Sequence, residues 1–539
     1  MSNFARELEP LAVRQLQFEG NHFADLSFAQ AVDVTATFRQ VGNAGAMVSA
    51  LAVPHRVHTN IPSLFSSAVA HGYVVGNKVK AVKTCGKPSR GERAGRAVWI
   101  LAWVAKKRNH ELLNLAISRI LVMMAPMSTT SRQPQTEVAS VTEIRSHFPA
   151  LERVHNGYPV AYFDGPGGTQ VPRYVVEKMS DYLYHHNANT HWAYPTSAET
   201  DAALAHARAV CAEFLNASPT EIAFGANMTT LTFHLARALS LNYDSNDEIV
   251  VTELDHHANI DPWRRLAVER GVTIRTVRLD TATGQLNPDD LERYIGPKTK
   301  LVAIGAASNA LGTINDLVTV IDLAHAAGAL VFVDGVHYAP HALIDVKELD
   351  CDFLGMSAYK FYGPHIGVLF AKRALLEQID FPKLVPAPDY APENAETGTQ
   401  NQEGMVGAAA AVEFLASLGR EWSSRESLRS IFQEMHTRNS VLFNRLWSAL
   451  SSMPRVTLYG PAPDALRTPT LAFTIEGCSS TDAARRLSDK GLFLSHGDFY
   501  AATVIKRFGL EPEGLIRAGC ACYTTEEEID RLIDALSQL

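Results

Sequence analysis

The sequence predicts an α/β protein: a large domain with a mainly parallel central sheet flanked by helices, followed by a smaller C-terminal α+β domain. Short apolar runs alternate with segments of helical period through most of the chain after residue 200. These runs are apolar throughout, as expected of parallel strands with both faces covered. Towards the C-terminus apolar and polar side chains alternate instead, which indicates a different, smaller unit.

The large domain can be laid out element by element. Ala203–Phe214 has helical period and ends at the stop signal Asn216–Pro219. Glu248–Thr252 has the length and composition of a short strand. Beyond it we predict a helix over Leu317–Ala327 and buried strands over Lys300–Ala307, Ala329–Asp334, Phe353–Ser357 and Gly367–Ala371.

The C-terminal elements follow a different pattern. After Met405 a long helical stretch is predicted to run towards residue 450. The alternation over residues 471–475 predicts a half-exposed strand. Thr525 and Glu528 form a capping box that begins the last helix, whose apolar face is made by Ile529, Leu532, Ile533 and Leu536.

The chain is thus predicted to contain four segments. Residues 1–130 show no sustained period and are expected to be a poorly ordered extension of unknown role. The stretch from Lys78 to Arg108 within this extension is basic, so the alternative interpretation is an arm that binds an anionic partner. Met124 or Met127, ahead of a polar stretch, is the expected start of the natural chain. Residues 141–200 are expected to be an N-terminal segment that joins the small domain. The large domain is expected to span residues 201–450, and the small C-terminal domain residues 451–539.

The bulk composition argues against several classes of protein. The formal net charge of −8 gives no electrostatic reason to expect nucleic-acid binding. The longest apolar stretches are too short or too interrupted to cross a bilayer, so we expect no membrane association. Six cysteines in 539 residues, none in zinc-binding spacing, favour a reducing, cytoplasmic setting and no metal site.

Asp334 closes one of the predicted buried strands. A carboxylate at the carboxyl end of such a strand lies where α/β proteins bind ligands. Because burial of an unpaired carboxylate is costly, Asp334 needs a cationic or strong donor partner, and a protonated pyridine nitrogen would serve. A helix cap or a structural ion pair is the alternative.

Lys360 follows the next predicted strand, in a turn rich in glycine, proline and aromatic residues. A lysine among apolar groups has a depressed pKa, which imine formation requires. The alternative is a surface lysine whose stem lies along apolar neighbours while its amine reaches water.

Around these two residues the chain resembles the class V aminotransferase family of fold-type-I pyridoxal 5′-phosphate (PLP) enzymes, in its cysteine desulfurase/selenocysteine lyase-like branch. The resemblance covers roughly Val141–Leu539. It implies a PLP-binding large domain, Lys360 as the Schiff-base lysine and Asp334 as the partner of the ring nitrogen. The other matching stretches are Ala161–Asp164, Gly225–Thr230, Glu253–Asn259, Ser308–Thr313, Glu396–Asn401 and Arg517–Gly519.

The resemblance also assigns the cofactor phosphate. Thr229 and Thr230, at a predicted helix N-terminus, and Ser357 are implied as its ligands; such a terminus favours anions. Thr399 matches a threonine that reaches the phosphate of the neighbouring subunit, which implies a homodimer with sites at the interface. The family usually has glycine where Met228 stands.

The remaining roles concern the ring and the substrate. The resemblance implies that His256 stacks on the pyridine ring and that Asn309 bonds its phenolic oxygen. Arg517 would clamp the carboxylate of a small amino-acid substrate, since its planar fork suits a carboxylate. His337 and Tyr359 stand where the family usually has glutamine and histidine, and both can still make polar contacts with the cofactor.

One departure affects the predicted reaction. Desulfurases of this branch carry a catalytic cysteine on a loop before the strand with the arginine, and Tyr500 occupies that position here. Tyrosine cannot accept sulfur as a persulfide. Cys520 and Cys522 lie just past Arg517, and we expect them to pack as small apolar groups rather than to replace the missing thiol.

Three functions therefore remain open. Desulfurase- or lyase-like β-elimination follows from the overall resemblance. Transamination or epimerisation of a small amino acid is favoured by the absence of the cysteine. A non-catalytic binding protein with the same fold would be expected to lack the lysine or the aspartate, and both are present.

Overall fold

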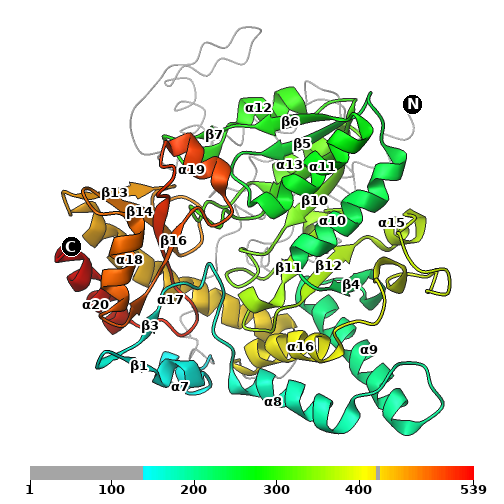
Figure 1. The fold of residues 1–539 in the computed structure, drawn as a ribbon, viewed down its shortest axis with the longest axis horizontal. Coiled ribbons are helices and arrows are strands. Elements are labelled where there is room, and N and C mark those ends of the chain that lie inside the picture. Colours follow the sequence, from blue (N-terminus) through cyan, green and yellow to red (C-terminus); the bar gives the residue numbers. More distant parts are fainter. Residues whose placement is uncertain (1–137, 420–424) are drawn as a thin grey trace, which may run out of the picture. The chain divides into compact units, whose positions relative to one another are not determined.

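A computed structural model of the chain describes residues 138–419 and 425–539 (Figure 1). The predicted extension over residues 1–130, its basic stretch and the expected start sites lie outside the described residues. No helix within the described ranges is long and apolar enough to span a membrane.

The larger of the two main sheets has seven strands. Their order across the sheet is β4 (Ile222–Gly225), β12 (Gly367–Ala371), β11 (Phe353–Ser357), β10 (Leu330–Asp334), β9 (Thr299–Gly305), β5 (Glu248–Thr252) and β6 (Thr273–Val277). The five strands from β11 to β6 run parallel, and β12 and β4 pair antiparallel at one edge. The predicted mainly parallel sheet is confirmed.

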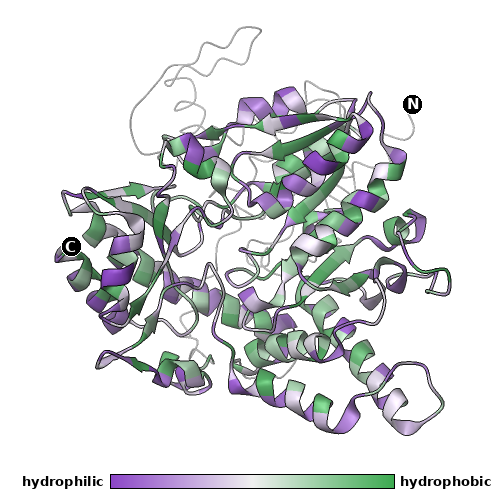
Figure 2. Cartoon of the chain, in the orientation of Figure 1, coloured by the Kyte–Doolittle hydropathy of each residue, from purple (hydrophilic) through white to green (hydrophobic). Residues whose placement is uncertain are grey.

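Both faces of this sheet are covered by helices, which explains why its strands are apolar throughout. Along β10, Val331 and Val333 pack into one core while Phe332 packs into the other. Figure 2 shows these strands as hydrophobic ribbons between helices with hydrophilic outer faces. The first core receives α9 (Pro195–Leu215), α13 (Leu317–Ala326) and α16 (Gln402–Ser417), and the second receives α10 (Met228–Leu239) and α11 (Asp261–Arg270).

The smaller sheet is antiparallel, in the order β13 (Val456–Tyr459), β14 (Thr470–Ile475), β17 (Leu515–Gly519) and β16 (Ser495–Gly497). Its core also receives α17 (Arg425–Ser451), α18 (Ser480–Ser488) and α20 (Glu526–Ser537). The capping box of Thr525 and Glu528 at the start of α20 is confirmed. The long helical stretch predicted after Met405 is two helices, α16 and α17.

The prediction that β14 is half-exposed was wrong, since only Thr474 of its six residues is partly exposed. Leu471 and Phe473 pack against the helices of the small unit. On the opposite face Ala472 packs against Leu311, which follows β9 of the seven-stranded sheet, and against α19 (Ala502–Phe508). The second face is covered by contacts distant in sequence, which period alone does not reveal.

The segment before α9 runs beside the small sheet. β3 (Ala161–Tyr162) pairs in parallel with β15 (Leu492–Phe493), and Asp164 pairs with Gly519 at the end of β17. The remaining elements are α7 (Val141–Ser146), β1 (Val154–His155), β2 (Tyr158–Pro159), α8 (Arg173–Asp181), β7 (Leu279–Asp280), β8 (Gln285–Leu286), α12 (Pro288–Tyr294), α14 (Val346–Leu349) and α15 (Arg373–Gln378).

Candidate active site

The candidate site lies at the carboxyl ends of β5, β9, β10 and β11, where parallel sheets bind ligands. Asp334 is the last residue of β10, and its Cα pairs with Gly355 of β11 on one side and Gly305 of β9 on the other. Lys360 ends the short 3-10 turn η7 (Ala358–Lys360) that follows β11 directly. His256 follows β5 after a short connection. Sheet topology therefore brings the three predicted residues to one edge.

Lys360 is buried, and its Nζ donates a hydrogen bond to the carbonyl of Pro166. Burial, and then the positive charge of Arg517, lower the pKa of its amine to about 7, while Asp334 and Asp164 oppose the shift. At neutral pH a large fraction of this amine is therefore unprotonated. An unprotonated lysine amine is the form that attacks a carbonyl carbon.

Asp334 is also buried, and burial raises the pKa of its carboxyl to about 6. The amide of Val336 donates to its Oδ1 at 2.9 Å, and Lys360 favours its charged form. Among the described residues no other hydrogen bond reaches this carboxylate. A protonated ring nitrogen would give it the strong donor that a buried carboxylate needs.

The His256 imidazole is fixed and neutral. Its Nδ1 accepts a hydrogen bond from the amide of Ala258 at 2.9 Å. Burial, and then Lys360, lower the pKa of the ring to about 4. The ring of Tyr500 lies beside it, with 5.5 Å between centroids and 33° between planes. A neutral ring held in this way can lie flat on another aromatic ring.

The neighbouring His257 points elsewhere. Its Nδ1 lies 2.9 Å from Asp261 and its Nε2 lies 3.1 Å from Thr503, so both ring nitrogens are engaged. Within the described ranges no three His, Cys, Asp or Glu side chains are grouped as a metal site would require. The two adjacent histidines thus have separate partners.

A candidate phosphate site lies at the N-terminus of α10. The buried hydroxyl of Ser357 accepts a hydrogen bond from the amide of Met228 at 3.1 Å, so β11 and the helix terminus meet there. Asn227 caps the helix and accepts bonds from the amide and hydroxyl of Thr230. Thr229 and Thr230 are exposed. Amides and hydroxyls at a helix N-terminus form an anion site.

Met228, where the family usually has glycine, packs inward. Its side chain is buried, and a Cβ added to Gly355 would lie 2.9 Å from its Cγ. Gly355 therefore leaves the space that the methionine fills. The methionine at position 228 is therefore accommodated on the buried side of the α10 N-terminus and not on its exposed side.

Asn309 and His337 carry buried polar atoms without partners. The Nδ2 of Asn309 donates to the carbonyl of Phe499 at 2.8 Å, while its Oδ1 has no partner in the described parts. The Nε2 of His337 lies 3.1 Å from the hydroxyls of Thr468 and Thr470, while its Nδ1 is likewise unpaired in the described ranges. Buried polar atoms are normally paired, so these fit a site that receives a polar group.

Arg517 projects from β17 into the same region. Its NH1 donates to the carbonyl of Asn309 at 2.6 Å and its Nε to Ser495 at 3.1 Å. The guanidinium lies 4.0 Å from the ring centroid of Phe499. Burial lowers the pKa of Arg517 to about 9, and the nearby Asp164 partly opposes this. The arginine is positioned by three contacts, and its other N–H groups carry no hydrogen bond within the described residues.

Two predicted residues differ in their surroundings. Tyr359 stacks on His365 with 5.0 Å between ring centroids. The Nζ of Lys360 lies 5.2 Å from the centroid of the Tyr359 ring. Thr399 is exposed on the loop before α16 and makes no hydrogen bond within the described part of the chain. The structure brings Tyr359 to the lysine and does not bring Thr399 into a contact with the other site residues.

Sequence reasoning missed Asp255, which is buried next to Asp334. Its Oδ1 accepts from the amide of Gly305 at 2.8 Å and its Oδ2 from Asn259 at 3.0 Å. Burial, with a smaller effect of Asp334, raises the pKa of this carboxyl to about 8. Its place between a buried strand and His256 was the available signal.

Phe499 was missed as well, although it lies one residue before Tyr500. The two residues have φ values of 55°, in the left-handed region that bulky side chains rarely adopt. Sequence gives no indication of these angles, because neither residue type favours them.

Cys520 and Cys522 pack as expected of small apolar groups. Both are buried, Cys520 in the core of the small sheet and Cys522 in a core of the large unit. Burial raises the pKa of each thiol to about 12. Neither thiol is poised to ionise.

Residues 161–532 match the protein family described as Aminotransferase class-V, so the chain belongs to that family. It is a PLP-dependent enzyme with the fold-type-I architecture, and its cofactor is pyridoxal 5′-phosphate. The buried lysine, the strand-end carboxylate, the helix N-terminus and the unpaired polar atoms fit such a cofactor.

The relatives lie in the cysteine desulfurase-like branch, which confirms the predicted resemblance. A cysteine desulfurase of Synechococcus elongatus is 34% identical over 439 residues, covering 77% of this chain and 67% of its own length. Aminotransferase-like protein FGM3 of Gibberella zeae is 34% identical over 412 residues, covering 74% and 98%. A solved cysteine desulfurase from Thermococcus onnurineus is similar with a TM-score of 0.67 at 27% identity, covering 74% and 97%.

Proposed function

We propose that this enzyme acts at the Cα of a small amino acid, in a cysteine desulfurase-like site that lacks the catalytic cysteine. The observation that carries the proposal is the convergence of Lys360, Asp334 and His256 at one sheet edge, with pKa values of about 7, 6 and 4. A partly unprotonated amine, an acid and a neutral flat ring are the three groups that such chemistry needs around PLP.

Each group has a distinct task. PLP, when bound, stabilises the charge left when a proton leaves the substrate Cα. The amine of Lys360 would hold the cofactor and, once the substrate's amine has taken its place, would accept the Cα proton. Asp334 keeps the ring nitrogen protonated, and His256 holds the ring flat. Arg517 orients the substrate through its carboxylate, which fixes the Cα near the amine.

The outer contacts that we propose for the cofactor are those that the family resemblance implies, and the same geometry supports them. Ser357, Thr229 and Thr230 would hold the phosphate at the N-terminus of α10. The amide of Asn309 has a second N–H, beyond the one given to Phe499, for the phenolic oxygen. His337 offers the Nδ1 that has no partner in the described residues, and Tyr359 can offer its hydroxyl as a polar contact.

We further propose a homodimer in which Thr399 serves the neighbouring subunit. Its exposure, and its lack of a hydrogen bond within the described part of its own chain, support this assignment. The loop that carries it is anchored at one end, because Glu396 is buried against Arg208 with two 2.7 Å bonds. An anchored loop with an exposed hydroxyl suits contact with a second chain.

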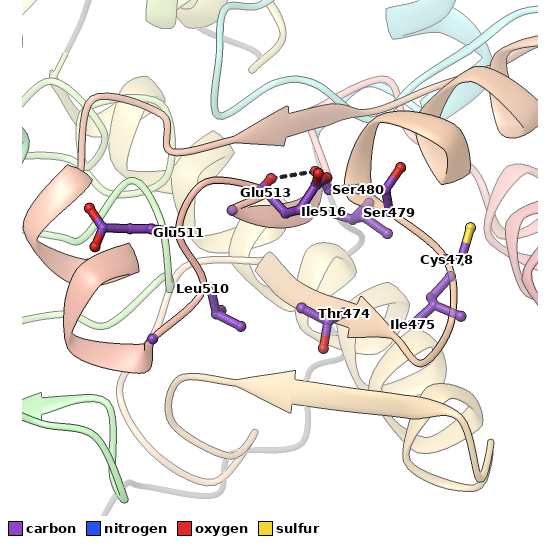
Figure 3. A pocket seen from close by; sticks show the side chains of 11 residues that line it. Thr474, Ile475, Cys478, Ser479, Ser480, Leu510, Glu511, Glu513 and Ile516 are labelled. Carbon is purple, nitrogen blue, oxygen red and sulfur yellow. Dashed lines mark hydrogen bonds between the residues drawn. The ribbon is translucent and has the colours of Figure 1, made fainter.

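The second candidate reaction, transamination or epimerisation, is favoured by Tyr500. Its ring lies beside His256, and the family resemblance implies that a desulfurase would carry its thiol at the position of Tyr500. Four of the five described cysteines are buried. The half-buried Cys478 lines a separate cavity of about 250 Å³ beside α18 (Figure 3), and none of its lining residues belongs to the proposed site.

The test is a panel of amino acids deuterated at Cα, incubated with the PLP-loaded enzyme. Loss of deuterium identifies substrates, and the products identify the reaction. Sulfide with alanine from cysteine would indicate desulfuration, a keto acid formed with transfer of the amine would indicate transamination, and the opposite enantiomer would indicate epimerisation. Retention of deuterium in every amino acid by an enzyme that holds PLP on Lys360 would overturn the proposal.

A further inference from the structure

We propose that Phe499 is a positioning residue that connects the substrate clamp to the cofactor site: its ring holds Arg517 and its carbonyl holds Asn309. This inference rests on the proposed function, because it gives Arg517 and Asn309 the roles described above. It adds a residue that supports both roles at once.

Three contacts form a closed triangle. The Arg517 guanidinium lies over the Phe499 ring, 4.0 Å from its centroid. The Phe499 carbonyl accepts from Asn309 Nδ2 at 2.8 Å. The carbonyl of Asn309 accepts from Arg517 NH1 at 2.6 Å. The three residues come from β17, the loop after β16 and the loop after β9, so each side of the triangle joins separate parts of the fold.

The backbone of this loop is strained. Phe499 and Tyr500 both have φ of 55°, and consecutive bulky residues in this region are costly. The conformation is held by Asp498, whose side chain accepts from the amide of Tyr500 at 2.9 Å and whose carbonyl accepts from Ala501 at 2.8 Å. The amide of His257 donates to the carbonyl of Tyr500 at 2.8 Å. Strain maintained by several bonds next to a site indicates a functional constraint.

The contact with this strained turn bears on which N–H groups of Arg517 remain available for the substrate carboxylate. A guanidinium has five N–H donors, and two are committed to Ser495 and Asn309. The contact with the Phe499 ring, 4.0 Å from Cζ to the ring centroid, uses no hydrogen bond, so within the described residues the remaining N–H groups stay available. A planar fork held by such a contact is prepared for a carboxylate and loses little freedom on binding.

The same loop also determines the Asn309 amide. With one N–H bound to Phe499, the second N–H of Nδ2 has a fixed direction. The ring and the carbonyl of Phe499 thus act on different partners, so loss of the ring alone should affect the arginine while the carbonyl still binds Asn309. This selective effect separates the proposal from a merely structural role for an aromatic residue in a loop.

The experiment compares Phe499→Leu, which removes the ring, with Phe499→Tyr, which retains it, in the PLP-loaded enzyme. The control is Phe508→Leu on α19, whose ring packs against Tyr459 at 5.0 Å. Two amines are titrated while the visible absorbance of the cofactor is followed. One is 2-methylalanine, which has a carboxylate but no Cα hydrogen to lose, and the other is 2-aminopropane, which has no carboxylate.

For Phe499→Leu we expect the affinity for 2-methylalanine to fall roughly 5- to 30-fold, the equivalent of one desolvated cation–π contact. Affinity for 2-aminopropane should stay within about 2-fold, and Phe499→Tyr and Phe508→Leu should match the wild type for both amines. Equal losses for both amines, or no loss for either, would overturn the role of Phe499.

A second measurement decides the matter without the reaction. The cofactor-free Lys360→Ala protein is treated with phenylglyoxal, and labelling of Arg517 is followed by mass spectrometry. Adding Phe499→Leu should speed this labelling several-fold, whereas Phe508→Leu should not. Unchanged labelling would refute the inference even if the wild type responds to neither amine, a result that by itself would refute the proposed function.

Discussion

Lys360 and Asp334 lie at the carboxyl ends of neighbouring parallel strands, and each favours the charged form of the other. Burial acts in the opposite direction on both and is the larger effect, so the pKa values are about 7 for the amine and about 6 for the carboxyl. Both groups of the pair therefore change their protonation near neutral pH. A small change in local charge should shift their pKa values measurably, so the charges can be tested by substitution.

Substitution of Lys360 by alanine should abolish covalent attachment of the cofactor. The buried amine that would form the bond is removed, while the phosphate site at α10 stays intact. The visible absorbance band of lysine-bound PLP should be lost, and borohydride should no longer fix the cofactor to the protein. Lys372→Ala, at a partly exposed lysine in an ion pair, is the matched control and should retain the band.

Attachment of PLP to the cofactor-free enzyme should accelerate as the pH rises through about 7, because the unprotonated amine of Lys360 is the reactive form. Asp334 raises the pKa of this amine, so Asp334→Asn should move the midpoint to lower pH. Arg517 lowers it, so Arg517→Gln should move the midpoint to higher pH. Stopped-flow absorbance across a pH series measures both shifts. Movement in the same direction for both variants would contradict the assignment of charges.

Much of the fold could be predicted because its strands carry a local signal. β5, β11 and β12 begin and end where the apolar runs do. The prediction that β14 is half-exposed failed for a physical reason, since its second face is covered by residues that follow strands of the seven-stranded sheet. Burial of that kind depends on the tertiary arrangement, and no periodicity within six residues can report it.

The site divides in the same way. Lys360 and Asp334 could be predicted because each follows a recognisable strand within a motif. Phe499 could not, because its partners Asn309 and Arg517 lie in different parts of the fold and its φ is unusual for phenylalanine. Asp255 resembles an ordinary turn residue in sequence, and only the fold shows that Gly305 and Asn259 bury its carboxylate.

Glu396 should be important for stability, because it is buried and bonded to both ends of the Arg208 fork as well as to the amide of Phe224. Glu396→Gln would remove the carboxylate that Arg208 binds directly and leave it only the weaker influence of Glu393, and removal of one partner of a buried pair costs about 3–5 kcal/mol. Urea denaturation of the PLP-free protein would measure the loss. The control Glu248→Gln, at a more exposed pair with Arg275, should cost less than about 1 kcal/mol. Similar losses for the two variants would contradict the argument from burial.

Asp255 should make the protein less stable as the pH rises. Its pKa in the folded state is about 8, well above the ordinary value of 3.8, mainly because of burial. The folded state therefore holds a proton that the unfolded state releases, and stability declines between about pH 4 and pH 8, at up to about 1.4 kcal/mol per pH unit. Asp255→Asn removes this titration, so the free energy of unfolding of the variant minus that of the wild type should grow with pH and level off above about 8.

Urea denaturation at five pH values from 5 to 9 provides the test, because the difference between the two proteins removes the titration of all groups that do not interact with Asp255. Asp261→Asn, at a half-exposed carboxylate a few residues away, is the matched control for the substitution of an aspartate by asparagine. A flat difference for Asp255→Asn would mean that this carboxyl stays ionised in the folded protein. Two adjacent carboxylates, at 255 and 334, would then be charged together, and the proton shared with the cofactor ring would have to offset their repulsion.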